Sequence, residues 1–214
     1  MTPQQEDWER FSSLKRMQNH WDRPDWTPGR QAYYWYLTWD SAPLRELADQ
    51  CQRALRSPYL DLVPLDALHL TMPKLAWADQ ISSDVLGQAV DNATDLCAAI
   101  ESFTIKVGPL AGSAGAVRFS VDPWPPILEL SRRLTEANPL GENHSSAEFR
   151  PHIGVAYCNS DIAAHPVIAR VEQLRGLPQI EVQVTAVELV LLRREGRSYR
   201  WSTFAEIQLA RFHN

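Results

Sequence analysis

The sequence predicts an α+β protein with a largely antiparallel sheet, and three observations carry this prediction. Strand-like and helix-like stretches mix along the 214 residues without strict β-α-β alternation. Two histidine motifs, His-Leu-Thr-Met at 69–72 and His-Ile-Gly-Val at 152–155, each lie in a short apolar run of strand type. Near the end, Glu195-Gly196-Arg197 separates two apolar runs and indicates a hairpin. With 44% hydrophobic and 22% charged residues, the chain can bury a large core.

The first thirty residues are expected to form an extension, and residues 31–214 a single bilobal domain. Apolar residues recur at helical spacing in this extension and predict a short amphipathic helix: Trp8, Phe11, Leu14 and Met17. Residues 22–29 hold two prolines and a glycine, which predicts an irregular linker. A lid, an oligomer contact and padding without a function are three open roles for this extension.

The first half of the domain is expected to begin with an aromatic strand at 31–39. A helix of about fourteen residues then follows the apolar spacing from Leu44 to Leu55. The strand of the first motif comes next and ends at Pro73. A long helix over 81–100, with Ser82 or Ser83 as its N-cap, completes this half.

The second half is expected to open with strands at 103–107 and 116–121, joined by a flexible segment at 108–115. A helix starts at Pro125-Pro126 and stops at Asn138-Pro139. The second motif strand then spans 151–157. A helix through 167–174 and two closing strands follow, at 180–194 and 199–210. The two motifs lie 83 residues apart, which suggests a distant internal duplication.

Charge and cysteine content narrow the function classes. The net charge of −5 argues against a protein that follows a long nucleic-acid backbone and favours a small anionic ligand or a nucleic-acid end. The cysteines have unrelated spacings, and the first two lie on predicted helix stripes, as buried small hydrophobes would: Cys51, Cys97 and Cys158. The sequence shows neither an apolar leader nor a run of about eighteen apolar residues, so we expect a cytoplasmic protein with no membrane contact. A monomer is expected.

The two histidines are the chemically informative residues. Side chains alternate between the faces of a strand, so His69 and Thr71 share one face while Leu70 and Met72 share the other. The same alternation separates His152 from Ile153. A histidine with an unperturbed pKa near 6.5 acts as base or acid at neutral pH. Two of them facing one cleft would form an acid–base pair that needs no metal.

The segments 68–72 and 149–157, read with their flanking elements, resemble the two motifs of the two-histidine (2H) phosphoesterase superfamily. The bacterial 2′-5′ RNA ligase or cyclic-phosphodiesterase branch is the most similar, and the likeness covers about residues 31–210. The resemblance implies two lobes related by a pseudo-twofold around a central cleft, with helices outside. It also implies a metal-independent phosphodiesterase without a cofactor. Its substrate would be a nucleotide or RNA end with a 2′,3′-cyclic phosphate or a 2′-5′ linkage.

The resemblance assigns roles to individual residues. His69 and His152 would be the acid–base pair, and the Thr71 hydroxyl would donate to a phosphate oxygen. The family's second motif carries Thr or Ser where this chain has Gly154. Backbone N–H groups or a nearby side chain would replace that hydroxyl, or binding would be weaker, or the site would serve another ligand.

Aromatic and basic residues near the motifs are the remaining candidates for substrate binding. Five rings could stack on a base: Tyr34, Tyr36, Trp77, Tyr157 and Trp201. Trp77 and Tyr157 are preferred because each lies a few residues beyond a motif. Arg150 and Lys74 flank the motifs and are candidates for a phosphate contact.

Two alternative functions remain open, and the sequence predicts neither a zinc site nor a catalytic role for the other histidines. The chain would otherwise be a non-catalytic module that binds a nucleotide or RNA end, or a ligase that uses a 5′-hydroxyl in place of water. A zinc site is not expected, because no Cys/His cluster supplies a third ligand. The other histidines are expected in surface or capping roles: His20, His144, His165 and His213.

Overall fold

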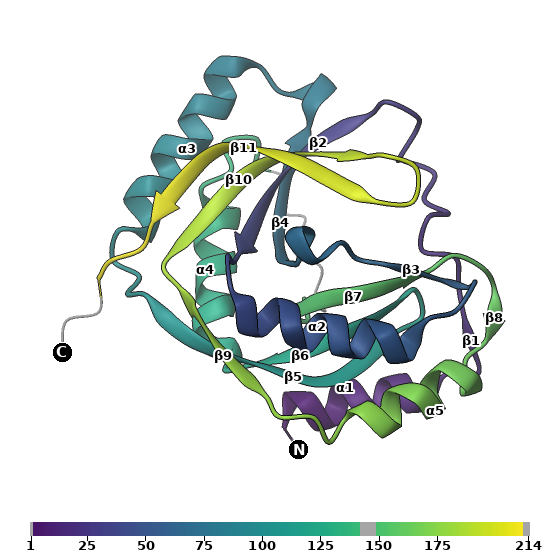
Figure 1. Ribbon diagram of the computed structural model, residues 1–214. Coiled ribbons are helices and arrows are strands. Elements are labelled where there is room, and N and C mark those ends of the chain that lie inside the picture. The colour runs from purple at the N-terminus through teal and green to yellow at the C-terminus, as the bar shows by residue number, and fades with distance from the viewer. Residues whose placement is uncertain (1, 142–148, 212–214) are drawn as a thin grey trace.

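The computed structural model describes residues 2–141 and 149–211, which form five α-helices and eleven β-strands. Nine strands join in one curled antiparallel sheet with the order β11-β10-β2-β4-β7-β6-β5-β9, and β3 pairs with β7 beside this path (Figure 1). The strands of this sheet are β2 (Gln31–Thr38), β3 (Leu60–Leu62), β4 (His69–Trp77), β5 (Phe103–Ser113), β6 (Ala116–Asp122), β7 (His152–Cys158), β9 (Ile180–Val184), β10 (Ala186–Arg194) and β11 (Tyr199–Gln208).

The remaining elements are a small second sheet and the helices. Strand β1 (Arg16–Met17) pairs antiparallel with β8 (Ile162–Ala163). The helices are α1 (Pro3–Ser12), α2 (Ala42–Leu55), α3 (Ser83–Cys97), α4 (Trp124–Glu136) and α5 (His165–Leu174). In the part of the chain that the structure describes, no helix has the length and apolar content needed to span a membrane.

The strands that carry the two histidine motifs lie next to each other at the centre of the sheet. Leu70 of β4 is opposite Ile153 of β7. On one side of this junction the path holds β2, β10 and β11, and on the other side β6, β5 and β9. Each half therefore places one motif strand at the junction, which confirms the predicted α+β class and the two related lobes.

The two faces of the sheet have different packing. On β2, Trp35 and Leu37 belong to the main hydrophobic core, whereas Tyr34 and Tyr36 point to the other face. There they join a second group, which we call the aromatic cluster: Trp21, Tyr36, Val190, Leu192 and Tyr199, with Trp26, Tyr34, Tyr157 and Trp201 packed against it. The alternation predicted for β2 and β4 explains this separation, because Leu70 and Met72 also lie in the main core.

The N-terminal segment contributes to both groups. Phe11 and Met17 are fully buried in the main core, and Trp21 lies in the aromatic cluster. The predicted helix is present as α1, but it is shorter than expected: it ends at Ser12, so Leu14 lies beyond it and Met17 lies in strand β1. Met17 is buried as a strand residue, so its apolar character matched helical spacing by coincidence.

Three strand predictions also need correction. The first motif strand does not end at Pro73, because β4 continues to Trp77. The segment 108–115 is not a flexible linker, because β5 continues to Ser113 and forms a hairpin with β6 through Ala114-Gly115. The run 180–194 is not one strand. It breaks at Thr185 into β9, which pairs with β5, and β10, which pairs with β2. One continuous apolar run therefore supplies strands to both halves of the sheet, which periodicity alone does not reveal.

Other local predictions are confirmed. Ser82 caps α3, since its side chain accepts a hydrogen bond from the Val85 amide. Helix α2 has the predicted fourteen residues. The three cysteines are free thiols in buried positions.

A glycine at the turn end of β5 gives a testable packing prediction. A Cβ at Gly112 would lie 2.4 Å from the Phe11 ring and 2.8 Å from the Ala116 carbonyl oxygen, whereas a Cβ at Gly87 in α3 would meet nothing within 4 Å. Gly112→Ala is therefore expected to lower the free energy of unfolding by about 1–3 kcal/mol through overpacking. Gly87→Ala is expected to raise it by up to about 1 kcal/mol, since alanine favours helix. Denaturant unfolding of both variants checks this, and a neutral Gly112→Ala would contradict the close contact.

Candidate active site

His69 and His152 lie on the same face of the sheet, on the two central strands. Leu70 and Ile153 are paired and point into the main core, so the flanking residues of both motifs project to the opposite face. Extending this antiparallel register by one residue places His69 across from Gly154 and Thr71 across from His152. The two histidines are then diagonal neighbours, about 7–8 Å apart at the backbone.

Both imidazoles are held by the same backbone contact. Nδ1 of His69 is 2.8 Å from the Ala67 carbonyl oxygen, and Nδ1 of His152 is 2.7 Å from the Arg150 carbonyl oxygen. In each case the acceptor is the carbonyl two residues earlier. A neutral ring that donates from Nδ1 leaves the lone pair on Nε2. The structure thus presents two matched imidazoles with Nε2 available for proton transfer.

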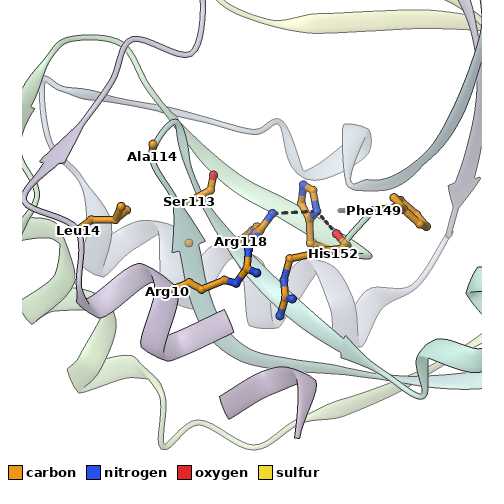
Figure 2. A pocket seen from close by; sticks show the side chains of 9 residues that line it. Arg10, Leu14, Ser113, Ala114, Arg118, Phe149 and His152 are labelled. Carbon is orange, nitrogen blue, oxygen red and sulfur yellow. Dashed lines mark hydrogen bonds between the residues drawn. The ribbon is translucent and has the colours of Figure 1, made fainter. Parts of the chain in front are cut away.

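Arg118 of β6 approaches the second histidine from the side. Its Nη1 lies 3.2 Å from Nδ1 of His152 (Figure 2). The Arg150 carbonyl oxygen lies closer to the same nitrogen, at 2.7 Å. A protonated Nδ1 cannot also accept a hydrogen bond, so the shorter carbonyl contact decides the tautomer. Arg118 then acts on His152 through its positive charge.

Burial shifts the protonation of both rings. It lowers the pKa of His69 to about 4, although the hydrogen bond to the Ala67 carbonyl acts to raise this pKa. Burial and then the Arg118 charge lower the pKa of His152 to about 3, and the charge of His69 adds to this effect. Both imidazoles are therefore neutral at pH 7 when no anion is bound.

Aromatic side chains enclose His69. Its ring stacks on Tyr36 with centroids 4.2 Å apart and planes within 8°, and it meets the Trp201 ring edge-on with centroids 5.1 Å apart. Thr71 lies across from Tyr36 in the pairing of β4 with β2, and its side chain acts against the burial that raises the pKa of the Tyr36 phenol. His69 is 6% exposed and lines a hollow of about 10 Å³, enough for about one water molecule. Tyr157, Tyr199 and Ser198 line the same hollow.

A larger cavity of about 430 Å³ opens beside His152. Besides His152, three arginines line it: Arg10, Arg118 and Arg150. Arg118 and Arg150 are half-buried, and Arg118 lies next to His152 (Figure 2). The turn of the β5–β6 hairpin and helix α1 supply the rest of the wall, including Ser113 and Leu14. The hollow at His69 and the cavity at His152 have no lining residue in common.

Helix α1 supplies the carboxylate that holds these arginines. Asp7 is 1% exposed, and its carboxylate accepts hydrogen bonds from Arg150 Nε and Ser120 Oγ, each at 2.8 Å. Arg118 Nη2 lies 3.7 Å from the same carboxylate. Glu6 pairs with Arg150 at 3.1 Å. This network fixes Arg118 beside His152 and fixes the Arg150 backbone that His152 contacts.

Gly154 and the preferred candidates for substrate binding lie in different surroundings. Gly154 and Tyr157 are on the site face of β7, and Arg150 lines the cavity at His152. Trp77 lies at the other end of β4: Trp77 pairs with Ala32 and His69 with Thr38, six residues or about 20 Å apart along β2. Its ring carries Lys74 Nζ at 3.4 Å and the Arg30 guanidinium at 3.7 Å. The structure therefore does not bring Trp77 and Lys74 to the histidines.

His20 is the main residue that sequence reasoning placed wrongly. It is not in a surface role: its ring stacks on Tyr157 with centroids 4.1 Å apart, and its Nε2 is 3.1 Å from the Tyr199 hydroxyl. Burial is the main cause that lowers its pKa to about 3. Asp7 and Arg118 were also missed, since neither lies near a motif. His165 is exposed at the start of α5, and His144 and His213 lie outside the described residues.

Among the described residues no group of three or more His, Cys, Asp or Glu side chains is placed to hold a metal ion. The chemistry that the site offers lies in two paired imidazoles, one threonine hydroxyl and a cationic wall. This combination suits proton transfer at an anionic centre.

Comparisons with known proteins agree with this geometry. A model of the 2′-5′ RNA ligase superfamily matches residues 40–197. A search of curated proteins gives no match. A solved structure of a phosphoesterase is similar, with a TM-score of 0.65 and 17% identity over 84% of this chain and 99% of that one.

Two further solved structures share the fold. LigT of E. coli complexed with 3′-AMP has a TM-score of 0.65 and 17% identity over 84% of this chain and 98% of that chain. TT0787 of Thermus thermophilus has a TM-score of 0.63 and 17% identity over 86% of this chain and 100% of that chain.

Proposed function

Because the chain belongs to the 2′-5′ RNA ligase superfamily, we propose that it is a phosphodiesterase that acts on a nucleotide or RNA end. The bond it cleaves is a phosphodiester of a ribose 2′,3′-cyclic phosphate or of a 2′-5′ linkage. The observation that carries this proposal is the matched pair of imidazoles, each held through Nδ1 by the carbonyl two residues before it. A phosphate between the two Nε2 atoms would meet one proton acceptor and one proton donor.

The reaction follows from these positions. A water oxygen attacks phosphorus while one imidazole takes its proton at Nε2. The bond from phosphorus to one ribose oxygen breaks, and the second imidazolium gives its proton to that oxygen. The Thr71 hydroxyl donates a hydrogen bond to a non-bridging oxygen, where negative charge accumulates. Arg118, on the site face of β6 and next to His152, adds positive potential for an anionic substrate.

Two observations support a nucleotide as the substrate. LigT, which shares the fold, was solved with 3′-AMP and with ATP. In this chain three guanidinium groups line the cavity at His152. Two carboxylates, those of Glu6 and Asp7, form ion pairs with this arginine group. A phosphorylated ligand fits such a wall better than a neutral one.

Incubation with 2′,3′-cyclic AMP and with short RNAs that end in a cyclic phosphate tests the proposal. The reaction contains EDTA, and phosphorus NMR follows the products. We expect the cyclic-phosphate signal to convert to a phosphomonoester signal, and the His165→Ala variant, altered at an exposed histidine outside the site, to do the same. Saturable binding without conversion of any of these substrates, or of a 2′-5′ dinucleotide, would contradict the proposal and indicate a binding module.

The lowered pKa values of both histidines predict the pH dependence of the reaction. Catalysis needs one neutral and one protonated imidazole. In the free enzyme this form is most populated between the pKa of His152, about 3, and that of His69, about 4. We therefore expect kcat/KM, which reports the free enzyme, to fall as pH rises from 5 to 8, by up to about tenfold per unit.

The bound complex should behave differently. The negative phosphate stabilises an imidazolium and raises its pKa, so the kcat profile should lie at higher pH than the kcat/KM profile. Initial rates at varied substrate concentration between pH 4.5 and 8 give both profiles. A kcat/KM optimum at or above pH 7 would contradict the lowered pKa values of the two histidines.

A further inference from the structure

We propose that the Tyr157 hydroxyl takes the place of the hydroxyl that the second motif lacks and donates a hydrogen bond to the substrate phosphate. This inference rests on the proposed function and names one more residue of the same site. The two motifs of the chain differ at one matched position. His69 is followed two residues later by Thr71, and His152 is followed two residues later by Gly154, so one half of the site has a hydroxyl that the other half lacks.

An irregularity in β7 brings Tyr157 to the site face. Val117 of β6 pairs with Ala156, and the next residue, Arg118, pairs with Gly154, so Val155 is an extra residue on β7. Val155 and Ala156 both lie in the main core. Simple alternation from His152 would have pointed Ala156 to the site and Tyr157 into the core. The bulge reverses this order, so Tyr157 projects on the side of His152 and Gly154.

The Tyr157 hydroxyl fills the space that a side chain at position 154 would use. A Cβ built on Gly154 would lie 3.3 Å from the Tyr157 hydroxyl oxygen, which is its nearest neighbour, and 3.6 Å from the ring carbon that carries it. Gly154 is across from His69 in the register of β4 and β7. Tyr157 and His69 also line the same small hollow. The phenol oxygen therefore lies at the edge of the space between the two motifs.

The hydroxyl is held in place and is available to donate. The Tyr157 ring is stacked on His20, at 4.1 Å, and meets Trp21 and Tyr199 edge-on. Among the described residues its hydroxyl makes no hydrogen bond. Burial raises the pKa of the Tyr157 phenol, so the group keeps its proton at neutral pH. A rigid, protonated and unpaired hydroxyl is the kind of donor that stabilises charge on a non-bridging oxygen.

A two-by-two set of variants tests the exchange of hydroxyls between positions 157 and 154. Tyr157→Phe removes one oxygen and keeps the ring, and we expect kcat to fall by about 10²–10³-fold. Gly154→Ser restores a hydroxyl in the space that this change empties, so the double variant should recover at least about tenfold of the lost kcat. In the wild-type background the same serine meets the Tyr157 hydroxyl, and we expect no gain. Tyr33→Phe, a matched loss of a hydroxyl on the opposite face of β2, should leave kcat unchanged.

Binding of inorganic phosphate gives a readout that does not depend on turnover. A hydrogen bond to a charged group is stronger than one between neutral groups, so Tyr157→Phe should weaken phosphate binding by about tenfold or more. Phosphorus NMR titrations of the same four proteins measure this. If the wild type binds phosphate but hydrolyses nothing, the proposed function fails and this titration still decides the role of Tyr157. Unchanged phosphate affinity and unchanged kcat in Tyr157→Phe, or a large gain from Gly154→Ser alone, would overturn the inference.

Discussion

Replacement of either His69 or His152 by alanine is expected to lower kcat by about 10²–10⁴-fold, the usual contribution of one general acid or base. Each variant removes one of the two proton transfers at phosphorus. Because the two act in a single displacement, the double variant should be little slower than the slower single variant. Initial rates on a 2′,3′-cyclic nucleotide measure this.

His165→Ala is the matched control for both histidine variants, since it removes an exposed imidazole at the start of α5 that lines neither the hollow at His69 nor the cavity at His152. Its kcat should equal that of the wild type. A His69→Ala or His152→Ala protein that folds and keeps a rate within about threefold of wild type would contradict the acid–base assignment. Near-UV circular dichroism of each variant shows whether the surrounding rings stay packed.

Loss of the Asp7 carboxylate is expected to have the largest effect on stability. Asp7 is 1% exposed and accepts hydrogen bonds from Arg150 and Ser120, and Arg118 lies at 3.7 Å. Asp7→Ala leaves the half-buried Arg118 guanidinium without that carboxylate. Breaking a buried ion pair in this way costs about 3–5 kcal/mol. Urea unfolding should show a decrease of this size in the free energy of unfolding.

Asp49→Ala provides the control for this prediction, because Asp49 pairs with Arg53 on the exposed side of α2. Such surface pairs contribute about 0–1 kcal/mol. We expect a change within that range. An Asp7→Ala protein as stable as the Asp49→Ala protein would show that α1 does not hold the arginines as described.

The sequence predicted the two motif strands and the face that each histidine occupies, because strand alternation is a local property. His69 and Leu70 need only the pleat of their own strand to be separated. Charge and composition also argued against extended nucleic-acid binding without reference to a fold. The short-range capping of α3 by Ser82 was readable for the same reason.

Other features depended on contacts between distant segments and left no local signal. The bulge at Val155 arises from the pairing of β7 with β6, so the sequence could not show that Tyr157 reaches the site face. Asp7 and His20 enter the site only because the N-terminal segment folds against strands that lie far along the chain. Trp77 was chosen for its nearness to a motif in sequence, but an extended strand carries it away from His69.

The central claim is that Nε2 of His69 and Nε2 of His152 face one phosphate. Nitrogen-15 NMR of histidine-labelled protein tests this directly when inorganic phosphate is titrated, with His69→Ala and His152→Ala variants to assign the signals. We expect both rings to start as the neutral form protonated on Nδ1, and both Nε2 signals to shift along one binding curve. A titration in which only one Nε2 signal shifts, or in which the two follow different curves, would contradict the claim.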